Sequence, residues 1–146
     1  MEVKVLAIED DREIVESITL ALGIYWPRTQ VISTHLGNRG VEMAKADSPD
    51  VIILDLGLPD TDGFEVLRQI RLFSSVPIVV LTVKSDEKNV VRMLEGGAND
   101  YIVKPFRQLE LLARLKTQLI QAMTVNLRTF LSETAASSTI TPEVKP

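Results

Sequence analysis

The sequence contains no cysteine and only one histidine, His35. The absence of cysteine excludes disulfide bonds and thiolate metal sites. One histidine cannot build a Ser-His-Asp triad or a histidine-rich metal site unless a partner chain contributes to it. His35 falls in a loop between expected elements, so we expect it to be exposed rather than catalytic. The remaining candidates for chemistry are carboxylates, hydroxyls and amines.

Long apolar runs and an excess of positive charge are also missing. No stretch approaches the roughly 20 apolar residues that span a bilayer, and residues 1–4 lead directly into an expected strand rather than into a signal peptide. With 16 basic and 20 acidic residues the net charge is −4, whereas DNA-binding domains usually carry a basic face. We expect a cytoplasmic protein without a membrane partner, whose segment seen here does not itself bind nucleic acid.

Four apolar runs each end on a polar side chain. The runs 3–8, 51–54, 78–81 and 101–103 are followed by Glu9 and Asp10, Asp55, Thr82 and Lys104, respectively. If the runs are parallel strands of one sheet, their ends meet at one edge, in the crevice where open α/β folds bind ligands. The sequence therefore predicts a pocket that holds three acids, a hydroxyl and an ammonium group.

Such a pocket favours phosphoryl chemistry. Clustered carboxylates repel each other and raise each other's pKa unless a hard divalent cation lies between them. Mg²⁺ is the natural candidate, and Mn²⁺ can substitute for it. One carboxylate could then attack a phosphoryl group, while the metal and Lys104 offset charge and Thr82 donates a hydrogen bond. The expected product is an aspartyl phosphate.

Strand-like runs alternate with helical periodicity along the chain, which is typical of an α/β doubly wound sheet. The expected strands are 4–9, 30–34, 51–55, 78–82 and 100–103, and the expected helices are 12–25, 38–46, 63–73, 86–95 and 107–123. Five such βα units suit a flavodoxin-like fold, with a five-stranded parallel sheet in the order 2-1-3-4-5.

Five separated motifs, in order, resemble a CheY-like response-regulator receiver domain, closest in pattern to the OmpR/PhoB subfamily. The motifs are Ile8-Glu9-Asp10-Asp11, Leu54-Asp55-Leu56-Gly57-Leu58-Pro59-Asp60, Asp62-Gly63, Leu81-Thr82, and Gly97-Ala98-Asn99-Asp100-Tyr101 running into Lys104-Pro105-Phe106. The resemblance implies the phospho-accepting half of two-component signalling, with a sensor histidine kinase as the partner. It implies a signalling domain whose only catalysis is phosphorylation and dephosphorylation of its own aspartate.

The resemblance also assigns a role to each matching residue. It implies Asp55 as phospho-acceptor; Glu9, Asp10, Asp55 and the backbone carbonyl of Gly57 as Mg²⁺ ligands; Lys104 as the phosphate-binding lysine; Thr82 and Tyr101 as the switch pair; and Pro105 as a cis-proline.

Two other functions stay open. A phosphatase of the haloacid-dehalogenase type also uses an aspartate at a strand end with Mg²⁺, but that family has a second acid two residues later, where this chain has Gly57. A phosphorylation-independent docking module, or pseudo-receiver, is the third alternative. Intact Asp10, Asp55, Thr82 and Lys104 argue against it.

The expected helices 86–95 and 107–123, with the strand 100–103 between them, resemble the face through which OmpR/PhoB-type regulators form parallel homodimers. Its expected members are apolar Val91, Leu94, Leu109, Leu112 and Ala113 and charged Asp100, Glu110, Arg114 and Lys116. We expect phosphorylation to promote a homodimer through this face. The alternative is a well-buried last helix with leftover apolar residues.

The receiver domain is expected to span residues 1–123. Residues 124–146 are rich in Ser, Thr and Ala and are expected to be a linker or tail, of which 125–131 could extend the last helix. The tail would lead to an output domain that is absent from this chain. DNA would be reached only through that domain, and a role in transcription is an analogy.

Overall fold

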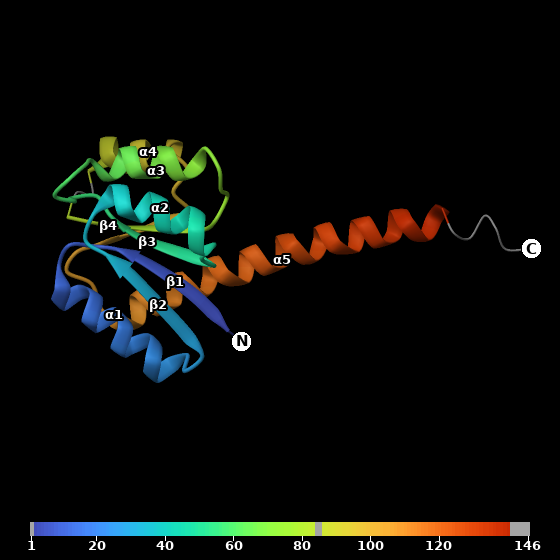
Figure 1. Cartoon of the computed structure of the whole chain (residues 1–146), viewed down its shortest axis with the longest axis horizontal. Coiled ribbons are helices and arrows are strands. Elements are labelled where there is room, and N and C mark those ends of the chain that lie inside the picture. Colours follow the sequence, from blue (N-terminus) through green and yellow to red (C-terminus); the bar gives the residue numbers. More distant parts are fainter. Residues whose placement is uncertain (1, 84–85, 141–146) are drawn as a thin grey trace, which may run out of the picture.

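A computed structural model describes residues 2–83 and 86–140 and has five parallel strands in one sheet (Figure 1). The strands are β1 (Val3–Ile8), β2 (Thr29–Thr34), β3 (Val51–Asp55), β4 (Ile78–Thr82) and β5 (Asp100–Val103). The helices are α1 (Arg12–Tyr25), α2 (Gly37–Asp47), α3 (Gly63–Arg71), α4 (Glu87–Glu95) and α5 (Gln108–Ile140). The order is β2-β1-β3-β4-β5, which confirms the expected flavodoxin-like topology.

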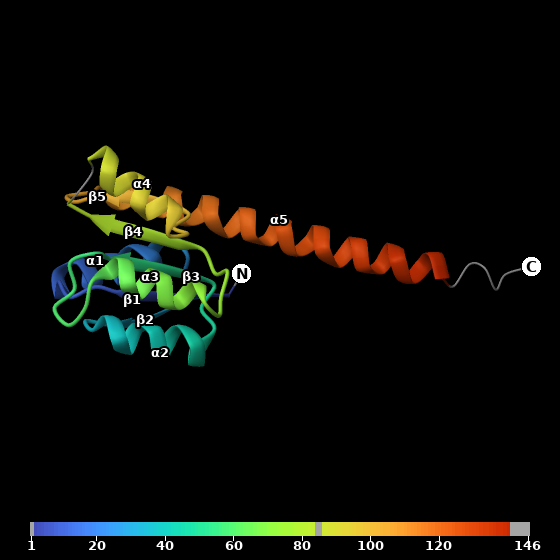
Figure 2. The same ribbon diagram turned by 90° about the horizontal axis from the view of Figure 1, so that it is seen from above.

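Helices cover both faces of the sheet, and each face has its own apolar core (Figure 2). On one face, Ile18 of α1 and Leu115 of α5 pack with strand residues such as Ile53. On the other, α2, α3 and α4 pack against the alternate strand residues, such as Leu54. Because β3 is buried on both faces, its sequence is a continuous apolar run that ends in Asp55.

Aspartates fix the loops at the carboxyl edge of the sheet. Asp11 is the N-cap of α1 and accepts hydrogen bonds from the backbone N–H groups of Glu13 and Ile14. Asp62 caps α3 in the same way. Each such cap is worth about 1 kcal/mol. The helices therefore begin at defined residues, which sets the position of the loops that carry the polar side chains.

Helix α5 is longer than the sequence indicated. It continues to Ile140, beyond the expected range 107–123, and projects from the domain as a single rod in both views (Figures 1 and 2). No glycine or proline follows Met123 before Pro142, so nothing in the sequence breaks the helix where the buried positions stop. Among the described residues, no helix is long and apolar enough to cross a membrane.

Candidate functional site

The register of the sheet brings the predicted site residues to one level. Asp55 at the end of β3 is paired with Leu81, next to Thr82 at the end of β4. Thr82 is paired with Val103, next to Lys104. The Lys104 backbone N–H donates to the Thr82 carbonyl at 2.8 Å, which ties these two strand ends together.

Three carboxylates form a cluster at this edge. One carboxylate oxygen from each of Glu9, Asp10 and Asp55 lies within 4.8 Å of the others. Glu9 and Asp55 are 2% and 5% exposed, whereas Asp10 is open to solvent. Oxygen ligands from two buried acids and one accessible acid fit a hard divalent cation such as Mg²⁺, which keeps part of its hydration shell. Receiver-type chemistry therefore has a suitable donor set here.

Lys104 joins the two buried acids. Its Nζ lies 2.6 Å from Glu9 Oε1 and 3.3 Å from Asp55 Oδ1, and its side chain is 16% exposed. Burial lowers the pKa of Lys104, but the ion pairs with Glu9 and Asp55 outweigh burial and raise it. The ammonium group is therefore held charged next to Asp55. The Lys104–Pro105 peptide bond is cis.

Glu9 and Asp55 are both buried, but their pKa values shift in opposite directions. Burial, together with the hydrogen bond to Asp55, raises the pKa of Glu9 to about 8. Burial also acts to raise the pKa of Asp55, but hydrogen bonds from Glu9 and from the Gly57 backbone N–H, at 3.0 Å, hold it below its ordinary value. Burial therefore favours the protonated form of Glu9, whereas the hydrogen bonds to Asp55 favour its anionic form.

The remaining predicted residues surround this pair. Thr82 is 2% exposed, and Tyr101 is half-buried on β5, packed against the core that α4 closes. Gly57 is exposed, and a Cβ built on it would meet only Asp55 Oδ1, at 3.8 Å. His35, as expected, is exposed and outside the acidic cluster.

Arg71 was not singled out from the sequence. Its guanidinium donates to the Gly97 carbonyl at 2.8 and 3.0 Å and to Asn99 Oδ1 at 2.9 Å. These bonds hold the turn before β5, in which Gly97 has a φ of 101°, a conformation that favours glycine. Arg71 thereby positions the strand that delivers Lys104. The only sequence signal was the Gly96-Gly97 pair, which gave no partner.

The residues expected on the dimer face fall into three groups. Val91 and Leu94 are 45% and 50% exposed on α4, and an ion pair of 3.0 Å joins Arg114 of α5 to Asp100 of β5. Glu110 is exposed nearby, and exposed Ala113 lies at the border between this face and the side of α5 that faces α1. These six residues remain candidates for that face.

The other three expected members, Leu109, Leu112 and Lys116, lie on other sides of α5. Leu112 is 6% exposed and lies in the core, because it forms one helical row with buried Leu115 and Leu119 at i, i+3 and i+7. Lys116 lines a cavity with Tyr25 and Trp26, on the side of α5 that faces α1. Leu109, seven residues before Lys116, lies on that same side.

Comparisons with known proteins agree with this site. Residues 5–116 match the family described as response regulator receiver domain. The chain is 42% identical over 115 residues to the KDP operon transcriptional regulatory protein KdpE of Escherichia coli, covering 79% of this chain and 50% of that protein. It is 40% identical over 119 residues to the DNA-binding response regulator MtrA of Mycobacterium tuberculosis, covering 82% and 51%. The chain thus spans about half the length of these curated relatives.

A solved structure gives the same result. The BeF3-activated N-terminal receiver domain of Klebsiella pneumoniae RstA is 36% identical, with a TM-score of 0.73, and the match covers 80% of this chain and 97% of that one. Fold, family match and relatives are consistent with a signalling domain that switches on phosphorylation rather than with a conventional enzyme. The chain belongs to the receiver domains of two-component response regulators, with relatives of the OmpR/PhoB type.

Proposed function

We propose that Asp55 of this receiver accepts a phosphoryl group from a sensor histidine kinase. The observation that carries the proposal is the contrast among the three acids. Asp55 is buried at a strand end, 3.3 Å from an ammonium group, and its pKa is held below the ordinary value, whereas burial raises the pKa of Glu9 and Asp10 is exposed. Asp55 is therefore the acid that is available as a nucleophile in a site that already contains positive charge.

In the proposed step, an Asp55 carboxylate oxygen forms a bond to phosphorus while the bond from phosphorus to the donor's nitrogen or oxygen breaks. The bonding electron pair leaves with the donor. Lys104 can turn from Glu9 toward the added phosphoryl oxygens, and the Thr82 hydroxyl can donate a hydrogen bond to them. Mg²⁺ bound by Glu9, Asp10, Asp55 and the Gly57 carbonyl would supply further positive charge when present.

The domain is proposed to phosphorylate and dephosphorylate only itself. A phosphatase of the haloacid-dehalogenase type needs an acid where Gly57 stands, and the open space over Gly57 offers no replacement. Turnover of an external phosphate ester therefore lacks its general acid.

Switching is proposed to reach the face made by α4, β5 and α5. When Thr82 moves toward the phosphoryl group, the half-buried Tyr101 can turn inward, because a packed interior has a few discrete arrangements. Tyr101 is on β5, next to Asp100, whose ion pair with Arg114 holds α5. This movement would change the shape of the exposed surface around Val91 and Leu94 and favour its contact with a second copy. In the whole protein, we propose that the consequence is DNA binding by an output domain, as the relatives' names suggest.

The test is phosphorylation with acetyl phosphate and Mg²⁺, followed by intact mass. We expect one added phosphoryl group in the wild type and none in Asp55→Asn or in excess EDTA. The matched control is Asp50→Asn, an exposed carboxylate that is remote in the fold from the Glu9, Asp10 and Asp55 cluster. Phosphorylation of Asp55→Asn at the wild-type level would disprove the assignment.

A further inference from the structure

Helix α5 carries a row of positions that the receiver core does not use. Leu109, Ala113, Lys116, Ile120, Met123, Leu127 and Phe130 follow one another at steps of four and three residues. All seven are exposed, and the five large apolar members are 51–63% exposed. We call this row the α5 seam. It is distinct from the buried row of Leu112, Leu115 and Leu119.

The spacing of the seam indicates a helical partner. Alternating steps of four and three repeat every seven residues, and this is the period at which two helices stay in contact as they wind around each other. A helix that packs only on its own domain needs no such second row. The seam runs for three heptads, which is the lower limit for a coiled coil.

The first half of the seam lies next to α1. Gln108 donates to Ser17 Oγ at 2.9 Å, and Lys116 and Ile120 line a cavity with Tyr25 and Trp26. Leu20 and Ile24 follow Ser17 at i+3 and i+7, on the same side of α1, and are 63% and 65% exposed. The seam and these α1 side chains therefore form one apolar face, which we call the α1–α5 face.

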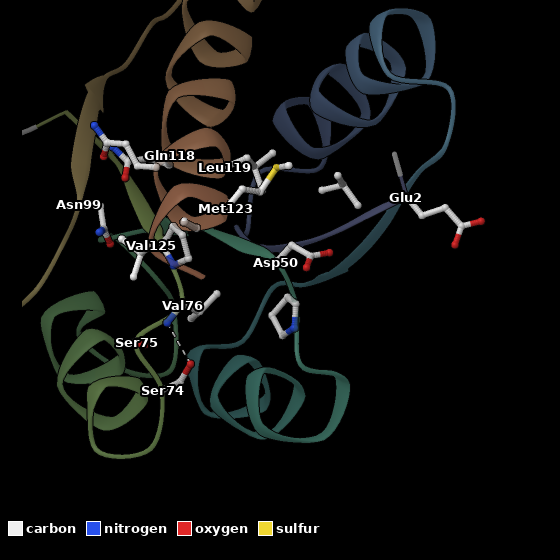
Figure 3. A pocket seen from close by; sticks show the side chains of 15 residues that line it. Glu2, Asp50, Ser74, Ser75, Val76, Asn99, Gln118, Leu119, Met123 and Val125 are labelled. Atoms are coloured by element: carbon white, nitrogen blue, oxygen red, sulfur yellow. Dashed lines mark hydrogen bonds between the residues drawn. The ribbon is translucent and has the colours of Figure 1, made fainter. Parts of the chain in front are cut away.

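The second half of the seam has no cover within the described part of the chain. Figure 3 shows the groove at the amino edge of the sheet where α5 leaves the domain. Met123 and Val125 are the last α5 residues that line it. Leu127 and Phe130 lie beyond it and are 56% and 62% exposed.

This protruding segment is a poor helix former by itself. Thr124, Val125 and Thr129 are β-branched, and a short unsupported helix is marginal in water even with better residues. Tertiary or quaternary packing must therefore supply most of its stability. The charges nearby, Arg128 and Glu133, are not members of the seam.

We propose that the α1–α5 face binds a second copy of this chain, with the two α5 helices in parallel along the seam. Parallel pairing sets equivalent residues against each other, so Leu127 meets Leu127 and the two α1 helices lie at the flanks. An antiparallel pair would instead set the protruding Leu127 and Phe130 of one copy against the globular domain of the other. Lys116 is the single charged member and can extend its ammonium group into water.

The available area is sufficient for this partner. A half-exposed Leu, Ile, Met, Tyr or Phe side chain leaves on the order of 60–100 Å² to bury. Eight such side chains on α1 and α5 of each copy bring the pair to the scale of the roughly 1,200 Å² that the smaller specific interfaces bury. The protruding part alone would not reach it. The seam and α1 must therefore act together.

This pairing does not depend on phosphorylation, because no seam residue contacts the acidic cluster. The experiment is accordingly sedimentation equilibrium of the full chain without Mg²⁺ or phosphoryl donor. We expect a dimer in the wild type and in Ser132→Glu, and an increase of at least about tenfold in the dissociation constant for Leu127→Glu. Ser132 is the matched control because it is exposed on the outer side of the same helical segment.

Orientation is tested with cysteines, since the chain has none of its own. Leu127→Cys should form an intermolecular disulfide under mild oxidation, and Ser132→Cys should not. Circular dichroism of each variant shows whether the helix is retained. A wild-type monomer at high concentration, equal dimerisation of Leu127→Glu and Ser132→Glu, or equal cross-linking of both cysteine variants would overturn the proposal. Each of these outcomes leaves phosphorylation of Asp55 untouched.

Discussion

The two sides of α5 differ in chemistry. On the side of β5, the helix is held by a charged pair, Arg114 with Asp100, and β5 also carries Tyr101 and leads into Lys104. On the side of α1, the helix offers the apolar α5 seam, which includes no member of the acidic cluster. Ion pairs at a partly exposed surface are individually weak and readily rearranged, whereas an apolar stripe associates without a trigger.

This difference suggests two uses for one helix. The β5 side is connected to the phosphorylation site through the strand between them, so its shape can depend on the state of Asp55. The seam has no such connection and would hold two copies together in either state. If both proposals hold, activation converts a standing dimer into a larger assembly.

The largest effect, on the free energy of unfolding, is expected for the buried row of α5 that contains Leu112, Leu115 and Leu119. Leu112→Ala should lower the free energy of unfolding by about 2–5 kcal/mol, because it leaves a cavity in the core. Leu109→Ala removes the same atoms from a 63% exposed position and should change it by less than about 1 kcal/mol in the monomer. Urea unfolding at low protein concentration measures both. Equal losses would mean that α5 is rotated from the orientation described here.

The sequence predicts features that depend on local patterns, but not those that depend on contacts between residues far apart in the chain. Apolar runs that end in polar residues located the strand ends, and therefore Glu9, Asp55 and Lys104, because parallel strands must share an edge. The sequence does not indicate how α5 is rotated about its own axis, and therefore which of its faces meets the sheet. This rotation depends on long-range contacts, Arg114 with Asp100 and Gln108 with Ser17, that no local pattern specifies.

The length of α5 was missed for a related reason. Positions that face the sheet stop near Met123, so the sequence predicts a linker or tail after it, of which only 125–131 could extend the helix. No glycine or proline follows Met123 before Pro142, so no residue of that kind ends the helix there. The resemblance to OmpR/PhoB regulators assigns Leu109 and Lys116 to a face with α4, whereas their spacing also continues into Ile120 and Leu127.

The next prediction separates the two interfaces. With beryllofluoride and Mg²⁺, the wild type should increase in mass beyond the standing dimer. Leu94→Asp should block this increase, because association would bury the new carboxylate of the α4 surface. The dissociation constant for the association that follows activation should rise by about tenfold or more. Leu127→Glu should still respond to activation but start from monomer.

Sedimentation velocity of the two single variants and the double variant provides the measurement. The two substitutions should act independently, since α4 packs in one core of the sheet and α5 in the other. If Leu94→Asp dissolved the unphosphorylated dimer, the standing interface would belong to the β5 side instead.

Replacing Lys104 should weaken association through the β5 side of α5 but not association through the α5 seam. Lys104→Ala removes the ammonium group that pairs with Glu9 and Asp55, so it should retain Mg²⁺ binding but reduce the activation-dependent mass increase by roughly tenfold in apparent affinity. The unphosphorylated dimer should not change. NMR shifts of α4 and β5 amides on adding beryllofluoride report the response directly. Loss of Mg²⁺ affinity with a full response would reverse the assigned roles.

The smallest effect concerns pH and Glu9. Because burial raises the pKa of Glu9 to about 8, the metal-free folded protein holds a proton that the unfolded chain releases near 4.5. Its stability should therefore fall as pH rises from about 4.5 through about 8, by at most about 1.4 kcal/mol per pH unit.

Mg²⁺ binding must displace this proton, so Mg²⁺ affinity should rise over the upper part of that range, by less than about tenfold per pH unit. Glu9→Gln should bind Mg²⁺ more weakly and lose this pH dependence of Mg²⁺ affinity, while the seam dimer, which does not include Glu9, keeps the same dissociation constant. Isothermal titration at about pH 6, 7 and 8 measures the Mg²⁺ affinity of both proteins and its pH dependence. Sedimentation measures the dissociation constant of the seam dimer. A flat wild-type profile, or a slope retained in Glu9→Gln, would place the proton on another group.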